Sequence, residues 1–305
     1  MKNSSINSIF KPVFFIGMGR SGSSIIYEAF AQHPELAFFS QYCTRFVKYP
    51  QLTFLHRFFK NYRIKEQWQK TNTINKIIPN PKEAYNIWEY LCGYKFRSDF
   101  MKDIKATLDE KKNTISYINK LIHWQGKKRF VSKITGPPRI EYLSSILKDA
   151  IFIDVLRDPR ATIYSTLCVN FRKKRGFNKP YWTNTLDMED LKIWERYNKS
   201  EISLLALEWK AVYKQTLKEK KCINSNQYLQ VKYENFIDNP IRSITSMYDN
   251  LDLELHKNVI QFLSKSNYKN TNYKYLENLT ENEVVTINEI CKEEIDQLGY
   301  KTKAC

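Results

Sequence analysis

The stretch VFFIGMGRSGSS, residues 13–24, runs from a continuous apolar segment into a segment rich in glycine and serine. Residues 13–16 are typical of a strand that is buried on both faces of a parallel sheet. Apolar residues then recur at helical spacing over 25–30, and His33-Pro34 marks the end of that helix. A buried strand, a glycine-containing loop and a helix in this order predict an α/β fold.

The rest of the chain repeats this alternation. Four more segments are predicted to be strands of the sheet: 36–39, 130–133, 151–156 and 228–233. Helices are predicted over 140–147 and, as one long or broken helix, over 188–220, while residues 171–185 are predicted to be a basic loop. Strands that alternate with helices favour a central parallel sheet of about five strands flanked by helices.

Residues 45–125 differ from the segments on either side of them. They are basic and aromatic, with Trp68, Trp88 and Trp124, and they contain no run typical of a buried strand. We therefore expect residues 1–305 to form a single domain, in which 45–125 is a helical insertion packed on the sheet.

The glycine-rich segment has the features of a phosphate-binding loop. Glycine lets the backbone approach an anion closely, and N–H groups at a helix N-terminus stabilise that anion. Compared with the P-loop pattern G-x-x-x-x-G-K-[ST], Gly17 and Gly22 have the required spacing, but Ser23 replaces the lysine and Arg20 supplies the charge. This favours a phosphate ester other than a nucleoside triphosphate. Ser23 or Ser24 is predicted to cap the helix that follows. The alternative to a phosphate-binding loop is a plain Gly-Ser turn.

A second basic motif, RDPRA at residues 157–161, directly follows the strand predicted over 151–156. Arg157 stands at the carboxyl end of that strand, where open α/β sheets bind ligands. Ser165 lies nearly two turns into the helix that Pro159 begins. Arg157 and Ser165 could therefore contact one phosphate, through charge-assisted hydrogen bonds of about 1.5–3 kcal/mol each. The alternative is a salt bridge at the start of this helix.

Together the two motifs resemble the signatures of the sulfotransferase superfamily, which uses 3′-phosphoadenosine-5′-phosphosulfate (PAPS). The likeness is greatest to the branch with tyrosylprotein sulfotransferases and bacterial sulfotransferases, and it extends over residues 12–42, 128–170 and 228–300. It implies a P-loop nucleotide-kinase-like fold and transfer of a sulfuryl group from PAPS to a hydroxyl, without a metal. The product nucleotide would be 3′-phosphoadenosine-5′-phosphate (PAP). The unmatched insertion at 45–125 is expected to cover the acceptor site.

The same resemblance assigns roles to residues of the two motifs. The loop GRSGSS at 19–24 would bind the 5′-phosphosulfate, and Arg157 with Ser165 would bind the 3′-phosphate. Tyr233, in VKYENF, would lie near the nucleotide, as its counterpart does in this branch. The residues expected to bind PAPS are Gly19, Arg20, Ser21, Gly22, Ser23, Ser24, Arg157, Ser165 and Tyr233.

The resemblance also implies catalytic residues. Lys133, in FVSKIT, occupies the place where this branch has a lysine that contacts the transferring sulfuryl group. With Arg20, it is expected to stabilise the charge that grows on the bridging oxygen as the bond to sulfur breaks. A solvated lysine at a strand end is the alternative for Lys133.

The general base stays open at the level of sequence. This branch carries a glutamate just after the second strand, but the matching residue here is Gln41, and an amide cannot accept a proton at neutral pH. His56, His123 and Glu83 in the insertion are other candidates. An acceptor that ionises easily, or an inactive protein, would also account for the glutamine.

Composition constrains the partners. The formal net charge of +17 fits an anionic ligand, although solvated lysines account for it equally well. The basic, aromatic insertion favours a bulky or anionic acceptor such as a glycan.

The six cysteines form no C-x-x-C pair and the four histidines lack metal-ligand spacing, so no metal site is expected. No export signal and no run of about 18 apolar residues occurs, which predicts a cytoplasmic enzyme without a membrane span.

Two other functions remain open. A P-loop kinase for a small molecule would use Asp154, near the end of a strand, as its metal-binding acid, but the loop lacks the kinase lysine. A basic nucleic-acid-binding module would explain the net charge but not two phosphate motifs at strand ends. We therefore expect no nucleic-acid partner.

Overall fold

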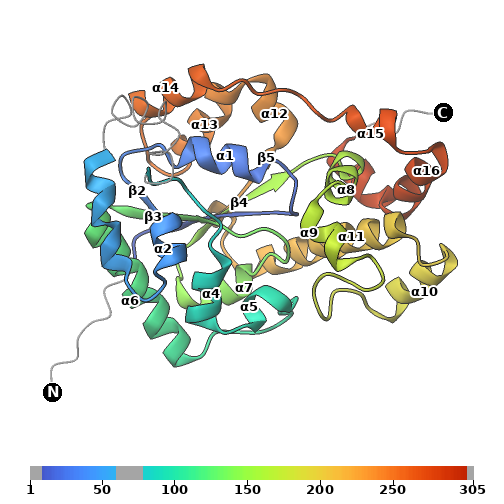
Figure 1. The fold of residues 1–305 in the computed structure, drawn as a ribbon, viewed down its shortest axis with the longest axis horizontal. Coiled ribbons are helices and arrows are strands. Elements are labelled where there is room, and N and C mark those ends of the chain that lie inside the picture. The colour runs from blue at the N-terminus through green and yellow to red at the C-terminus, as the bar shows by residue number, and fades with distance from the viewer. Residues whose placement is uncertain (1–8, 60–77, 301–305) are drawn as a thin grey trace.

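The structure is a computed structural model that describes residues 9–59 and 78–300. Its centre is one sheet of five parallel strands in the order β2-β3-β1-β4-β5 (Figure 1). The strands are β1 (Val13–Ile16), β2 (Leu36–Phe38), β3 (Arg129–Lys133), β4 (Ile151–Leu156) and β5 (Tyr228–Lys232). The α/β fold and all five predicted strands are confirmed, because continuous apolar runs are a strong signal for strands buried on both faces.

Helices cover both faces of the sheet, as Figure 1 shows. One face carries α1 (Ser23–Phe30), α12 (Tyr233–Asp238), α13 (Pro240–Asp249) and α14 (Lys257–Lys265). The other carries α4 (Tyr85–Cys92), α5 (Lys95–Ser98), α6 (Leu108–Gln125) and α7 (Ile140–Ile146). A third group shares its own core: α8 (Pro159–Leu167), α9 (Asn170–Arg175), α10 (Met188–Arg196), α11 (Glu201–Glu219), α15 (Lys274–Asn278), α16 (Glu281–Ile290) and α17 (Lys292–Leu298). Short elements complete the described chain: α2 (Gln41–Arg45) and the 3₁₀ helices η1 (Pro50–Phe59), η3 (Lys220–Cys222) and η4 (Ser225–Gln227).

The central strand β1 explains the two layers of the core. Its side chains alternate between the faces of the sheet, and all of them are buried. The ring of Phe14 lies 6.0 Å from that of Trp88 in α4, while the ring of Phe15 lies 5.0 Å from that of Phe30 in α1. One apolar strand therefore anchors helices on both sides.

The strand order also locates a crevice. After β1 the chain crosses toward the β2 edge, and after β4 it crosses toward the β5 edge. The loops that follow β1 and β4, which begin at Gly17 and Arg157, therefore diverge at the carboxyl ends of two adjacent parallel strands. Ligands of open α/β sheets bind at such a switch point.

The insertion predicted over 45–125 is helical where the structure describes it. It contains η1, α4, α5 and α6, whereas residues 60–77, including Trp68, lie outside the described residues. Helix α6 begins with a capping box formed by Thr107 and Glu110 and ends at Gly126. Local sequence signals therefore set the bounds of its longest helix.

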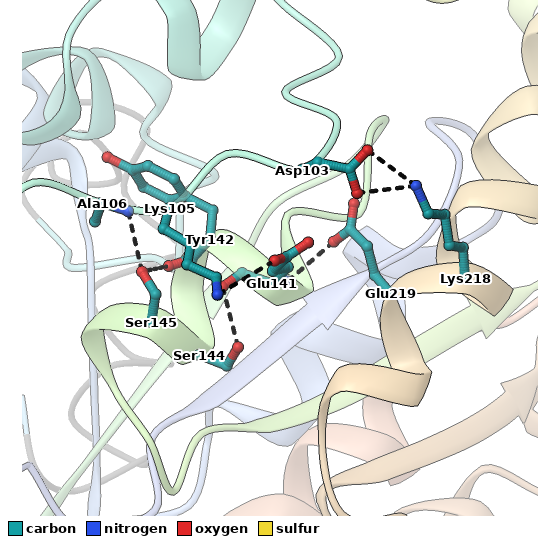
Figure 2. A network of polar contacts seen from close by, with 9 residues as sticks. All are labelled: Asp103, Lys105, Ala106, Glu141, Tyr142, Ser144, Ser145, Lys218 and Glu219. Atoms are coloured by element: carbon teal, nitrogen blue, oxygen red, sulfur yellow. Dashed lines mark hydrogen bonds and ion pairs between the residues drawn. The ribbon is translucent and has the colours of Figure 1, made fainter.

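A polar network fastens the segment between α5 and α6 of this insertion to α7 and α11 (Figure 2). Lys218 of α11 donates to both carboxylate oxygens of Asp103, at 2.9 and 3.0 Å. The backbone N–H of Glu141, at the start of α7, donates to the buried carboxylate of Glu219 at 3.0 Å. Burial raises the pKa of Glu219. These contacts hold the insertion against α7 and α11.

One detail differs from the sequence prediction. The basic loop expected over 171–185 begins with helix α9, which ends at Gly176, where φ is +80°. This helix is held by Arg172, whose guanidinium donates to Glu208 of α11 at 2.8 Å, and a local reading cannot reveal such a contact. The segment 188–220 is the broken form of the predicted helix, with its break between α10 and α11. Within residues 9–59 and 78–300, no helix is both long and apolar enough to cross a membrane.

Candidate active site

The loop between β1 and α1 is fixed by two close approaches. Gly17 and Gly22 have φ of +122° and +86°, values that side chains other than glycine rarely adopt. A Cβ at Gly22 would lie 2.2 Å from Cδ2 of Tyr233, and one at Gly17 would lie 2.6 Å from the carbonyl oxygen of Val155. The loop therefore packs directly against the end of β4 and the start of α12.

The N-terminus of α1 has no side-chain cap. The predicted cap by Ser23 or Ser24 is wrong, because Gly22 is the N-cap residue and no side chain accepts a hydrogen bond from the first turn. The hydroxyl of Ser24 instead accepts a hydrogen bond from Nζ of Lys133 at 2.7 Å. Uncapped N–H groups at a helix start suit an anion.

Arg20 connects the two motifs. Its backbone is left-handed, with φ of +71°, a conformation that costs free energy for any residue with a side chain. Its Nε donates to Oγ of Ser165 at 3.1 Å, and its carbonyl oxygen accepts from Nη1 of Arg157 at 3.1 Å. Arg157 and Ser165, which are predicted to bind one phosphate, therefore both contact Arg20.

Arg157 is held by contacts that the sequence did not indicate. Its Nε donates to Oδ1 of Asn272 at 2.7 Å, and its Nη2 donates to Oγ1 of Thr271 at 2.9 Å. The guanidinium lies 4.4 Å from the ring centroid of Tyr233. Burial lowers the pKa of Arg157, so an anion beside it would stabilise its charge. The polar run KNTN at 269–272 was the only sequence signal for Thr271 and Asn272.

The second arginine of the RDPR motif has a different place. Arg160 is buried, and its Nε and Nη2 donate to the two carboxylate oxygens of Asp158 at 2.9 and 2.7 Å. Asp158 also caps α8 by accepting from the backbone N–H of Arg160. The helix-terminal salt bridge considered for this motif is therefore made by Arg160, which leaves Arg157 for the crevice.

Lys133 and Glu83 form an ion pair at the end of β3. Nζ of Lys133 lies 3.1 Å from Oε2 of Glu83, and the lysine is buried. The backbone N–H of Thr135 donates to Oε1 of Glu83 at 2.7 Å, and the Thr135 hydroxyl donates to the same oxygen. Because Lys133 also contacts Ser24, the pair lies beside the start of α1.

A cavity of about 480 Å³ opens next to this pair. Gly19, Arg20, Glu83 and Thr135 line it, together with side chains from α9 and from the segment that follows it. The cavity thus brings the glycine loop, a carboxylate and part of the basic segment over 171–185 to one place. A molecule in it can approach the loop and Glu83 at once.

The other residues considered as a base lie elsewhere. Gln41 donates through Nε2 to the carbonyl of Ile78 and accepts through Oε1 from the N–H of Asn80 at 3.1 Å. His56 is buried, with Nε2 2.8 Å from Oγ of Ser40. His123 lies in the exposed last turn of α6. Neither histidine lines the cavity that Glu83 lines.

Solved structures share this fold. A sulfotransferase from Mycobacterium avium superposes with a TM-score of 0.62 at 17% identity, over 97% of this chain and 79% of that one. The sulfotransferase domain of the olefin synthase from Synechococcus PCC 7002 gives 0.50 at 15% identity, over 97% and 96%. A sulfotransferase from Mycobacterium tuberculosis H37Rv gives 0.52 at 14% identity, over 93% and 76%. Such low identities establish the fold alone.

The fold and the crevice define an α/β protein that presents glycine-loop N–H groups and two arginines at a switch point of its sheet. The profile of the sulfotransferase family matches residues 12–257, so the chain belongs to the sulfotransferase family. A comparison with curated proteins found no match.

The strained backbone of Arg20 allows its binding role to be separated from folding. We expect Arg20→Gly to weaken PAP binding tenfold or more, because it removes a charge-assisted contact worth about 1.5–3 kcal/mol. The free energy of unfolding should stay the same or rise by up to about 1 kcal/mol, because glycine relieves the left-handed strain. Calorimetry with PAP and urea unfolding would measure the two effects.

Asn198→Gly is the matched control for this variant. Asn198 is exposed between α10 and α11 and has a similar left-handed φ of +53°. The control should leave PAP affinity unchanged. An Arg20→Gly protein that binds PAP like the wild type would remove Arg20 from the nucleotide site.

Proposed function

We propose that this sulfotransferase takes its sulfuryl group from PAPS, binding it in the crevice between the β1 and β4 loops. The observation that carries the proposal is the bridge made by Arg20, which contacts both Ser165 and Arg157. The glycine loop and the start of α1 would bind the 5′-phosphosulfate. Arg157 and Ser165 would bind the 3′-phosphate, and Tyr233 would pack near the nucleotide.

The transfer step follows from the Lys133–Glu83 pair. The acceptor hydroxyl oxygen attacks sulfur, and the bond between sulfur and the bridging oxygen breaks. The electron pair of that bond stays on the 5′-phosphate oxygen of PAP, where Lys133 and Arg20 stabilise the growing negative charge. Protein cations supply this charge stabilisation.

Glu83 is proposed as the general base that receives the hydroxyl proton. It lines the cavity beside the loop, and its contacts with Lys133 and Thr135 fix the carboxylate there. When the phosphosulfate binds, its negative charge would compete for Lys133 and leave Glu83 free to accept the proton.

The acceptor is proposed to be a hydroxyl-bearing molecule that enters over the insertion, with a glycan or another bulky or anionic compound favoured. Family membership disfavours the kinase and nucleic-acid alternatives. Asp154, the acid that a kinase would need, is buried and accepts from the Tyr228 hydroxyl at 2.7 Å, and burial raises its pKa to about 6. The cytoplasmic location stays a prediction.

Calorimetry with PAP, AMP and ATP tests the donor site. PAP and AMP differ only in the 3′-phosphate, so AMP should bind a few hundredfold more weakly if two contacts of about 1.5–3 kcal/mol are lost. Equal affinities for PAP and AMP would reject the role of Arg157 and Ser165. ATP binding more tightly than PAP would favour the kinase.

Lys133→Ala tests charge stabilisation in the transition state. We expect the slow hydrolysis of PAPS by the enzyme alone to fall by about 10²–10³, while PAP affinity changes little. Lys128→Ala, at the opposite end of β3, is the control and should change neither quantity. Losses of affinity and rate in equal proportion would make Lys133 a ground-state phosphate ligand.

Glu83→Gln tests the base. The amide can keep hydrogen bonds near Thr135 but cannot take a proton, so PAPS hydrolysis should fall by about 10²–10⁴ with PAP affinity retained. The double variant Glu83→Gln/Gln41→Glu places a carboxylate at the family position instead. An unchanged rate in Glu83→Gln would reject Glu83 as the base. Recovery of the rate in the double variant would show that a carboxylate at position 41 can take over the role of Glu83.

A further inference from the structure

One wall of the active-site cavity is aromatic. Phe171, Tyr181 and Trp182 line it, and the ring of Tyr181 lies 6.1 Å from that of Phe171 and 5.0 Å from that of Trp182. Trp182 is held in place by Gly136, where a Cβ would lie 2.4 Å from the indole. A preformed aromatic wall in a cavity of about 480 Å³ suits a flat apolar body.

Most charges of the cavity are paired within the protein. Arg172 is buried, and its Nη2 donates to both carboxylate oxygens of Glu208, at 2.9 and 2.8 Å. Arg97 lies 3.5 Å from Glu89, in a pair that is partly exposed. The cavity carboxylate Glu83 is paired with Lys133, which lies beside the cavity. Arg20 forms no ion pair among the described residues, but it contacts Ser165 in the proposed donor site. Arg172 and Arg97 are therefore largely compensated before any acceptor binds, and Arg20 belongs to the proposed donor site.

Arg175 differs from the other arginines of the cavity in its contacts. It lines the same cavity from the end of α9, it is exposed, and its guanidinium lies 4.4 Å from the ring centroid of Tyr181. Among residues 9–59 and 78–300, no carboxylate forms an ion pair with it. A cation held on an aromatic face at a cavity wall is placed to bind an anionic group of a molecule that stacks there.

We propose that the cavity selects acceptors that carry a negatively charged group on an aromatic or similarly flat body, with Arg175 as the residue that recognises the charge. The body packs on Tyr181 and Trp182, the anionic group contacts Arg175, and the hydroxyl faces Glu83. The proposal rests on the proposed function for the reaction itself, but the preference for an anion is a property of the cavity and can be measured by binding alone.

Two fluorescent naphthols provide a matched pair of probes. 6-Hydroxynaphthalene-2-sulfonate and 2-naphthol share the rings and the hydroxyl and differ in the sulfonate. Their dissociation constants would be measured by fluorescence titration, with and without saturating PAP, on the full chain. The proteins are the wild type, Arg175→Gln and the control Lys174→Gln, which removes an exposed charge from the neighbouring position of α9.

The wild type should bind the sulfonate about tenfold more tightly than 2-naphthol, as expected for one charge-assisted contact at a partly exposed site. Arg175→Gln should abolish this preference by weakening the sulfonate and leaving 2-naphthol unchanged. Lys174→Gln should keep the preference. A general effect of net charge would instead lower it equally in both variants.

Several results would overturn the proposal. They are no binding of the sulfonate, equal binding of both probes by the wild type, or a preference that survives Arg175→Gln. Failure of the proposed function is separate, since it would appear as weak binding of PAP in the same titrations. If PAP fails to bind while the Arg175-dependent preference persists, the donor assignment fails and the selectivity of the cavity stands.

Discussion

The site depends on the contact of Gly22 with Tyr233. Any side chain at Gly22 would lie within the ring of Tyr233, so the glycine loop can approach α12 only because position 22 has no Cβ. The same ring lies against the guanidinium of Arg157. Loop, aromatic ring and arginine therefore form one packed unit, and a displacement of any of them would move the others. This unit places the two predicted phosphate-binding motifs, which are far apart in sequence, at one crevice.

The Lys133–Glu83 pair adds a second constraint, which concerns charge. A buried lysine without a partner would be costly, and Glu83 neutralises it in the absence of an anion. If PAPS binds as we propose, its phosphosulfate would replace Glu83 as the partner of Lys133, because Ser24 links Lys133 to the start of α1. The resting contact thus keeps a carboxylate in the cavity wall and a cation beside it without leaving either uncompensated.

The sequence predicts the parts of this structure that depend on local signals. The run at 13–16 and the turn at Gly17 identify a buried strand and its loop, and 151–156 locates Arg157 at the end of a neighbouring strand. Local signals do not show which of Arg157 and Arg160 is used in a helix cap. Nor do they bring Glu83 to Lys133, because that contact depends on how the insertion packs across the sheet.

The glutamine at position 41, where the resemblance predicts a general base, has a structural explanation. Gln41 uses its amide as a donor to Ile78 and as an acceptor from Asn80, and it thereby pins the segment that leads into Glu83. A glutamate at position 41 could accept from Asn80 but, when ionised, could not donate to the carbonyl of Ile78. If Glu83 is the base, as we propose, the change from carboxylate to amide at position 41 is part of what holds the new carboxylate in the cavity. The amide at position 41 and the carboxylate at position 83 then depend on each other, because Gln41 holds the segment that leads into Glu83.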